Sequence, residues 1–264
     1  GLVGEEVSSV VVTPEPSSIV IAAGWKLTSD NPVSTDAMIW RHLKDDSVWA
    51  TTLKAPFTAD EYPDLKNERS ERIRAALMDP ASGALVVIGE RDFQVDIFQF
   101  VSRTFLARFV PLGGALGDPW TSGGDAFPHD AANSITLCGD IFLLSGWTRE
   151  QDPQAQPQPL LRWLADDLSW TKRSAESMSM TRLYGAACDR EGKVVSAGLR
   201  TSGGLDARVF AFEDPLGSRT WYETGAPGDD GAGGLVCDMR GFCVWPGFRT
   251  IGGKQVAVVR VHHP

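Results

Sequence analysis

The sequence predicts an all-β fold, namely a five-bladed β-propeller of four-stranded antiparallel blades. Two observations lead to this prediction. Short apolar runs that end in glycine recur about every 50 to 65 residues, and other apolar or alternating runs keep step with them. Four strands per unit without helical periodicity favour radially packed blades over a sandwich of unrelated strands. At 264 residues, a single propeller domain is expected.

The glycine-ended runs define the second strand of each repeat unit, called strand B. Their glycines are 65, 57, 52 and 49 positions apart. A glycine at such a point lets a neighbouring backbone approach closely at a bend or bulge. The five runs are 19–24, 84–89, 141–146, 194–198 and 242–247.

The other strands are placed relative to strand B. Strand A precedes it as an apolar run at 7–12, 73–78, 135–138, 184–188 and 235–237. Strand C follows it as an alternating run at 38–40, 97–100, 160–163, 208–212 and 256–261. Strand D is centred in four units on Trp49, Phe105, Trp170 and Trp221. The repeat units are approximately 7–55, 72–110, 133–172, 183–224 and 233–262, and the last, without strand D, is either incomplete or closed by the N-terminus.

This unit of a glycine-ended apolar strand, a loop with aspartate, an apolar-aromatic strand and a tryptophan strand resembles a known repeat. It is similar to the delta-sixty type and kindred propeller repeats of bacterial secreted and surface proteins, over roughly residues 7–262. The resemblance implies a binding or scaffold module, and it carries over no catalytic motif.

Composition and charge exclude several classes of protein. Hydrophobic residues make up 42% and charged residues 22%, which suits a globular protein with a buried core. The 25 basic and 34 acidic residues give a net charge of −9, so nucleic acid is not expected as a partner. No apolar stretch is long enough for a membrane span, and no secretion signal stands at the start, as in a mature, processed chain.

The four cysteines are spaced in step with the repeat. Cys138, Cys188 and Cys237 are 50 and 49 positions apart, at the same point of strand A, and Cys243 lies across a hairpin from Cys237. Disulfides Cys138–Cys188 and Cys237–Cys243 are therefore predicted, which suits an oxidising compartment. Four buried thiols are the alternative. Neither a zinc nor a calcium motif is present, and no metal or cofactor is predicted.

The loops differ between the two predicted faces of the propeller. Turns between strands A and B are short and rich in Asp and Gly, as at 79–83 and 139–140. Loops between strands B and C and links between units are long, and they share the other face. They are 55–72, where a short helix can form, 111–133, 147–159 and 225–234. Because long loops on a rigid scaffold often carry function, the binding surface is expected there.

The candidate binding residues lie at this long-loop face. Trp25 and Trp147 follow a strand-B glycine at the mouth of a loop, and with Trp120 they can stack on sugar rings or peptide side chains, the alternative being burial under the loops. The entrances to strand A are predicted to line an axial funnel. The polar candidates there are Glu71, Arg72, Arg74, His129, Asp130, Arg182, Tyr184, Asp229 and Asp230.

These features favour a non-catalytic binding or scaffold propeller, extracellular or at a cell surface, that recognises a protein or glycan. The first alternative is a glycan-active hydrolase or lyase that uses two funnel carboxylates, although no spacing singles out a pair. The second is a structural module of a larger surface protein. Catalytic residues are not assigned, because the sequence has neither a serine nucleophile elbow nor a phosphate loop. The oligomeric state is not predicted.

Overall fold

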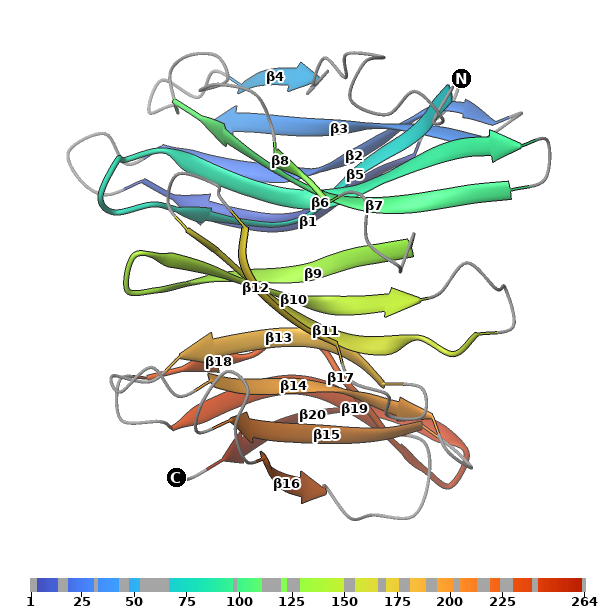
Figure 1. Cartoon of the computed structure of the whole chain (residues 1–264), viewed down its shortest axis with the longest axis vertical. Coiled ribbons are helices and arrows are strands. Elements are labelled where there is room, and N and C mark those ends of the chain that lie inside the picture. The colour runs from blue at the N-terminus through green and yellow to red at the C-terminus, as the bar shows by residue number, and fades with distance from the viewer. Residues whose placement is uncertain are drawn as a thin grey trace. The chain divides into compact units, whose positions relative to one another are not determined.

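The computed structural model is built from β-strands (Figure 1). It describes residues 4–13, 19–30, 33–42, 48–52, 67–96, 99–110, 120–122, 129–149, 155–165, 170–175, 181–188, 194–201, 205–212, 219–223, 230–238 and 242–262. No helix occurs in these residues, and thus none that is long and apolar enough to cross a membrane. The prediction of an all-β chain is confirmed.

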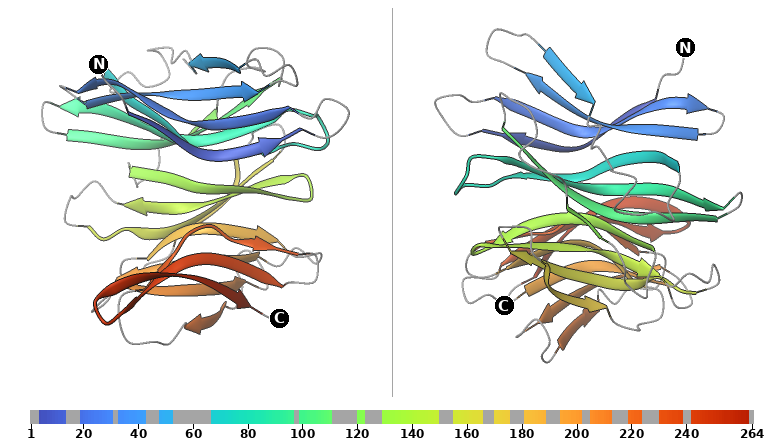
Figure 2. Two further views of the ribbon diagram at one scale, coloured as in Figure 1. Left: turned by 180° about the vertical axis from the view of Figure 1, so that it is seen from behind. Right: turned by 45° about the horizontal axis from the view of Figure 1, so that its top comes forward.

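The first compact unit, Gly1–Ala131, contains an eight-stranded sheet made of two antiparallel meanders. The first meander comprises β1 (Glu5–Val12), β2 (Val20–Asp30), β3 (Val33–His42) and β4 (Val48–Thr52). The second comprises β5 (Asn67–Met78), β6 (Leu85–Asp96), β7 (Gln99–Phe109) and β8 (Trp120–Thr121). A parallel bridge between Thr35 and Ser70 joins them. In Figure 2, the blue β1–β3 and the green β5–β7 form two layers.

The second compact unit, Ala132–Pro264, contains three sheets. The first, whose initial residues 129–131 still belong to the first unit, consists of β9 (His129–Cys138), β10 (Ile141–Arg149), β11 (Gln158–Ala165) and β12 (Trp170–Ala175). The second consists of β13 (Thr181–Cys188), β14 (Val194–Thr201), β15 (Leu205–Phe212) and β16 (Arg219–Glu223). In the third, β17 (Asp230–Ala232) and β18 (Val236–Cys237) both pair with β19 (Cys243–Ile251), which pairs with β20 (Lys254–His262).

The predicted strand order A, B, C, D recurs along the structure. Strands A and B of each repeat pair antiparallel, as β1 with β2, β5 with β6 and β13 with β14. Three of the four predicted D strands are present, as β4, β12 and β16. The last group ends with strand C, β20, in the part of the chain that the structure describes. Five blades and a closed ring stay predictions.

The predicted strand D around Phe105 is wrong. Phe105 lies in the middle of β7, which runs without a break from Gln99 to Phe109, and strand D of this meander is β8. The sequence from 103 to 109 contains no glycine, proline, asparagine, aspartate or serine, so nothing in it favours a turn before Phe105. The second repeat therefore extends to Thr121.

Several predicted loops are shorter than expected because strands continue into them. In the predicted loop 55–72, residues 67–72 belong to β5, so the prediction of a short helix is wrong for this part. Residues 55–66 lie outside the described residues. In 111–133, residues 120–121 and 129–133 are strands. In 147–159, residues 147–149 and 158–159 are strands, and in 225–234 residues 230–232 are a strand. The ends of these strands consist largely of polar residues, and the sequence therefore predicted loops there.

Apolar side chains pack between the two meanders of the first unit. The cluster contains Ile21 and Ala23 of β2, Ile39 of β3, and Leu85 and Phe105 of β6 and β7, all nearly inaccessible to solvent. The second unit has two smaller clusters, one around Leu143 and Trp163 and one around Val195 and Trp245. Alternating apolar positions on neighbouring strands build each cluster.

The strand-B glycines have the role that the sequence predicts. A β-carbon on Gly24, Gly89 or Gly198 would lie 1.8, 2.1 or 2.3 Å from a carbonyl oxygen of the neighbouring strand A, and one on Gly247 would lie 2.0 Å from the carbonyl oxygen of Gly231 in β17. The register of strand A shifts by one residue beside three of these glycines, at Ser8, Arg74 and Tyr184. Gly24, Gly89 and Gly198 thus each accommodate a bulge in strand A.

Replacing Gly89 with alanine is expected to lower the free energy of unfolding by about 3 kcal/mol or more, the upper range for overpacking. The new β-carbon would meet the Arg72 carbonyl oxygen at 2.1 Å and the Phe105 ring at 2.6 Å. Gly233→Ala is the matched control, because nothing lies within 4 Å of the added carbon. Chemical denaturation of both variants measures the difference, and equal unfolding free energies would contradict the role assigned to Gly89.

Both predicted disulfides are present in the second unit. Cys138 of β9 and Cys188 of β13 have Cα atoms 5.7 Å apart and join the A strands of two successive repeats. A hydrogen bond from Asn133 Nδ2 to the Leu183 carbonyl, 2.7 Å long, joins the same two strands. Cys237 and Cys243 form the second disulfide across a cross-strand pair of β18 and β19.

Candidate functional site

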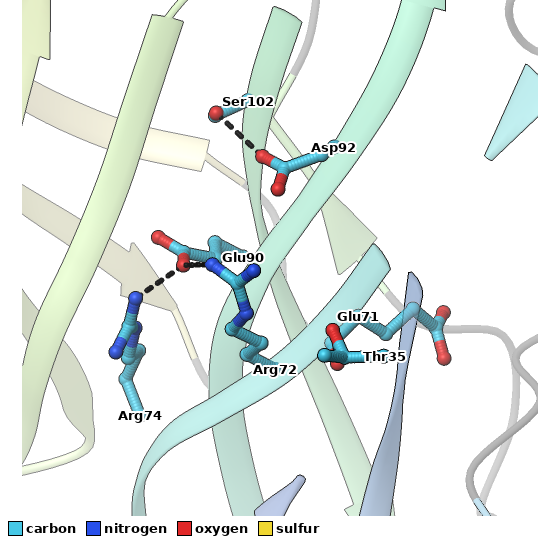
Figure 3. Close-up of polar contacts among 7 residues, drawn as sticks. All are labelled: Thr35, Glu71, Arg72, Arg74, Glu90, Asp92 and Ser102. Atoms are coloured by element: carbon cyan, nitrogen blue, oxygen red, sulfur yellow. Dashed lines mark hydrogen bonds and ion pairs between the residues drawn. The ribbon is translucent and has the colours of Figure 1, made fainter. Parts of the chain in front are cut away.

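A group of polar side chains covers one face of β5, β6 and β7, just beyond the strand-B glycine Gly89 (Figure 3). Cross-strand pairing places Arg72 opposite Glu90, and Asp92 opposite Ser102. Arg74, the bulged residue of β5, reaches the same group. We call Arg72, Arg74, Glu90, Asp92 and Ser102 the polar cluster.

Glu90 is the centre of the charged contacts in the polar cluster. Its Oε1 accepts a hydrogen bond of 3.2 Å from Arg72 Nη1 and a second one from Arg74 Nη2. The Glu90 side chain is 10% exposed, whereas the side chains of Arg72 and Arg74 are 27% and 32% exposed. One largely buried carboxylate thus holds two guanidinium groups that solvent still reaches.

Asp92 is the second carboxylic acid of the polar cluster. Ser102 donates its hydroxyl proton to Asp92 Oδ1 at 2.6 Å. Burial raises the pKa of Asp92 above its ordinary value of 3.8, and the charge of Glu90 raises it further. The Ser102 hydrogen bond and the two arginines lower this pKa, but burial outweighs them. A half-buried carboxyl group with a raised pKa is typical of groups that donate or accept protons.

Glu71 belongs to a different contact, although its neighbour in sequence, Arg72, is in the polar cluster. Its carboxylate points away from Glu90 and Asp92 (Figure 3) and forms an ion pair of 2.5 Å with Arg91 Nε. Arg91 is 1% exposed, and its guanidinium lies 4.9 Å from the centre of the Phe105 ring. Thr35 donates a hydrogen bond of 3.1 Å to the Glu71 carbonyl oxygen. The ligand contact predicted for Glu71 stays a prediction.

His129 and Asp130 are buried at the start of β9. Asp130 Oδ1 accepts hydrogen bonds from the Thr104 amide at 2.9 Å and the Ser122 hydroxyl at 2.6 Å. His129 Nδ1 accepts one from the Ser102 amide at 3.4 Å. Both residues belong to the first unit, where these bonds hold them against β7 and Ser122. A ligand role for either residue stays a prediction.

The predicted tryptophans lie on strands rather than at the mouths of loops. Trp25 is inside β2 and Trp147 inside β10, both half-buried, and Trp120 is half-buried on β8. The guanidinium of Arg72 lies 5.8 Å from the Trp25 ring centre, and that of Arg182 lies 5.3 Å from the Trp147 ring centre. Both distances suit cation–π contacts.

The remaining candidates lie in the second unit. Tyr184 is the half-buried bulged residue of β13, and Arg182 is exposed two residues before it. Asp230 begins β17, and its side chain, like all of Asp229, lies outside the described residues. No group of three or more metal-binding side chains occurs among the residues that the structure describes.

Sequence reasoning missed Glu90, Asp92 and Ser102. The sequence does contain a signal for these residues, namely the type of residue that follows the strand-B glycine in each repeat. It is Trp25, Glu90, Trp147, Leu199 and Phe248. A charged Glu-Arg-Asp run directly after five apolar or small residues departs from this apolar pattern, and a departure from a repeat that the fold does not need indicates function.

No family model and no curated protein matches the sequence. Several solved structures resemble the chain. A GH43 β-1,3-galactosidase with galactodeoxynojirimycin has a TM-score of 0.55 at 10% identity, over 96% of this chain and 88% of that one. A PL25 ulvan lyase has a TM-score of 0.54 at 10% identity, over 96% and 66% of the two chains. A Trypanosoma rangeli sialidase with 2,3-difluorosialic acid has a TM-score of 0.52 at 10% identity, over 97% and 44%.

At these identities the similarity concerns the fold alone. The chain shares an all-β propeller fold with glycan-active hydrolases and lyases, and it spans less than half of the sialidase chain. The predicted resemblance to bacterial propeller repeats is thus confirmed at the level of the propeller fold.

Proposed function

We propose that this protein is a glycan-active hydrolase or lyase on a five-bladed propeller, with Asp92 as its proton-transferring group. One observation carries the proposal: Asp92 has a raised pKa and lies beside Glu90, which two arginines hold. Two neighbouring carboxyl groups in different environments are a basis for acid–base catalysis.

The chemistry follows from the two environments. Cleavage of a glycosidic bond needs a group that keeps a proton and transfers it to the leaving oxygen. The raised pKa keeps Asp92 protonated to a higher pH than an ordinary aspartate. Glu90, fixed by Arg72 and Arg74, provides a negative charge that stabilises a cationic transition state or activates a water molecule.

The fold comparisons support the enzyme over the non-catalytic binding module that the sequence favours. The structures most useful for comparison are a galactosidase, a lyase and a sialidase, all of which act on glycans. Fold alone is a weak argument for function, so the proposal depends on the polar cluster. The two disulfides suit an oxidising compartment, and we propose an extracellular or cell-surface location with a glycan as partner.

A polysaccharide panel tests this proposal. We expect the wild-type protein to release new reducing ends, or an unsaturated product in the case of a lyase, from one class of glycan. Glu90→Gln is expected to lower the rate about 10²-fold or more, since a charge near the reacting centre is lost. Glu6→Gln, at an exposed position on β1, is the matched control and should leave the rate unchanged. Binding of a glycan without turnover would contradict the proposal and support a binding module.

A further inference from the structure

The two arginines of the polar cluster share one carboxylate oxygen. Arg72 Nη1 and Arg74 Nη2 both donate to Glu90 Oε1. Two positive charges thus lie against a single carboxylate oxygen, on a chain whose net charge is −9.

Most of the hydrogen-bonding capacity of these arginines is left over. A guanidinium has five N–H donors, and Glu90 takes one from each arginine. The side chains of Arg72 and Arg74 are exposed by about a quarter and a third, so a ligand can reach part of each guanidinium, although Arg74 Nε is buried. The Trp25 ring lies against the flat face of the Arg72 guanidinium. The N–H donors of Arg72 lie in the plane of the guanidinium and do not point at this ring.

A purely structural ion pair is a poor explanation of this arrangement. The ion pair between Glu71 and Arg91 in the same region is nearly inaccessible to solvent. In contrast, the polar cluster places two arginines on one carboxylate oxygen, their side chains are 27% and 32% exposed, and Glu90 occupies a position that is apolar in the other four repeats. A carboxylate that orients two arginines toward solvent prepares them to bind a second anion.

We propose that Arg72 and Arg74 bind an anionic group of the sugar, a uronate carboxylate or a sulfate ester, so that the substrate class is an acidic glycan. This inference rests on the proposed function, since it assigns the substrate of the same site. Guanidinium groups recognise both anions through paired hydrogen bonds. An acidic substrate also explains why an acidic protein concentrates arginines here, because the local charge must offset the overall repulsion.

Calorimetric binding to matched oligosaccharides tests the inference. The probes are oligogalacturonate, its methyl ester, a sulfated galactan oligosaccharide and the unsulfated galactan. We expect at least one acidic probe to bind about tenfold or more tightly than its neutral counterpart. The comparison within the wild-type protein does not depend on the folding of any variant. Preference for the uronate or for the sulfate identifies which anion is used.

Variants then assign the preference to the two arginines. Arg72→Gln and Arg74→Gln are each expected to weaken binding of the acidic probe about tenfold and leave binding of the neutral probe unchanged. Lys254→Gln, which removes one positive charge from an exposed site on β20, should change neither. Equal affinity for acidic and neutral probes, or no binding of any acidic probe, would overturn the inference. Tight acidic binding without turnover would overturn the proposed enzyme and leave this inference intact.

Discussion

Replacement of Asp92 by asparagine is expected to slow glycan cleavage by about 10² to 10⁴-fold, the range for loss of a general acid or base. Asparagine has the same shape, and its carbonyl oxygen can still accept the hydrogen bond from Ser102. The proton that aspartate transfers is lost. The measurement is the turnover rate on the glycan that the panel identifies. Asp140→Asn, an exposed turn position, is the matched control.

The pH dependence gives a second result for the same variant. Where Asp92 acts as the acid, the wild-type rate should fall as pH rises through its pKa, which burial places above 3.8. The residual activity of Asp92→Asn should lack that fall. An unchanged pH profile in the variant would contradict the role of Asp92.

The raised pKa of Asp92 also predicts how Asp92→Asn changes the stability of the protein. Folding favours the protonated form of Asp92, so the buried charge destabilises the native protein at pH values above its folded pKa. This cost is absent below the unfolded value of 3.8, where the carboxyl is protonated in both states. Asp92→Asn is thus expected to raise the melting temperature at neutral pH and to leave it unchanged in acid. A lower melting temperature at neutral pH would indicate a structural role instead.

Removal of the Cys138–Cys188 disulfide is expected to lower the free energy of unfolding by about 4 kcal/mol, from the entropy of closing a loop of this length. The bonded cysteines are 50 positions apart, and the bond joins strands of two successive repeats. The Cys237–Cys243 bond spans only 6 positions, and its loss should cost about 2 kcal/mol. Paired serine substitutions at each site, compared by chemical denaturation, give both values.

The difference between the two disulfides is the informative quantity. Each pair of serines is the control for the other, because the same atoms are changed in the same unit of the protein. Equal costs would show that the long loop is already held in the unfolded state or that strand contacts such as Asn133 with Leu183 keep β9 and β13 together.

The strands that the sequence predicted best are those whose apolar residues are buried. Strand B carries buried apolar side chains in the first four repeats, such as Ile21, Val87, Leu143 and Val195. Its glycine is needed because the Arg72 carbonyl leaves no room for a side chain at Gly89. The disulfides were predictable for a similar reason, since equal spacing of Cys138 and Cys188 places them at equivalent points.

The site was harder to predict because its residues do not follow the repeat. Glu90 and Asp92 continue a strand in which the apolar pattern has ended, so the sequence around them indicates neither core nor turn. The bulge at Arg74 changes which side chains share a face, and no simple alternation reveals it. Strand D of the second repeat was misplaced because Phe105 looks like an outer aromatic residue but fills the core.

The close contact of Gly24, Gly89 and Gly198 with the bulged strand A has a consequence for evolution and design. The glycine accommodates the bulge, so the residue directly after it can differ in chemistry from repeat to repeat. Trp25, Glu90 and Leu199 occupy this position in three repeats. The fold therefore has several equivalent positions, directly after the strand-B glycines, at which a single substitution can introduce a new specificity.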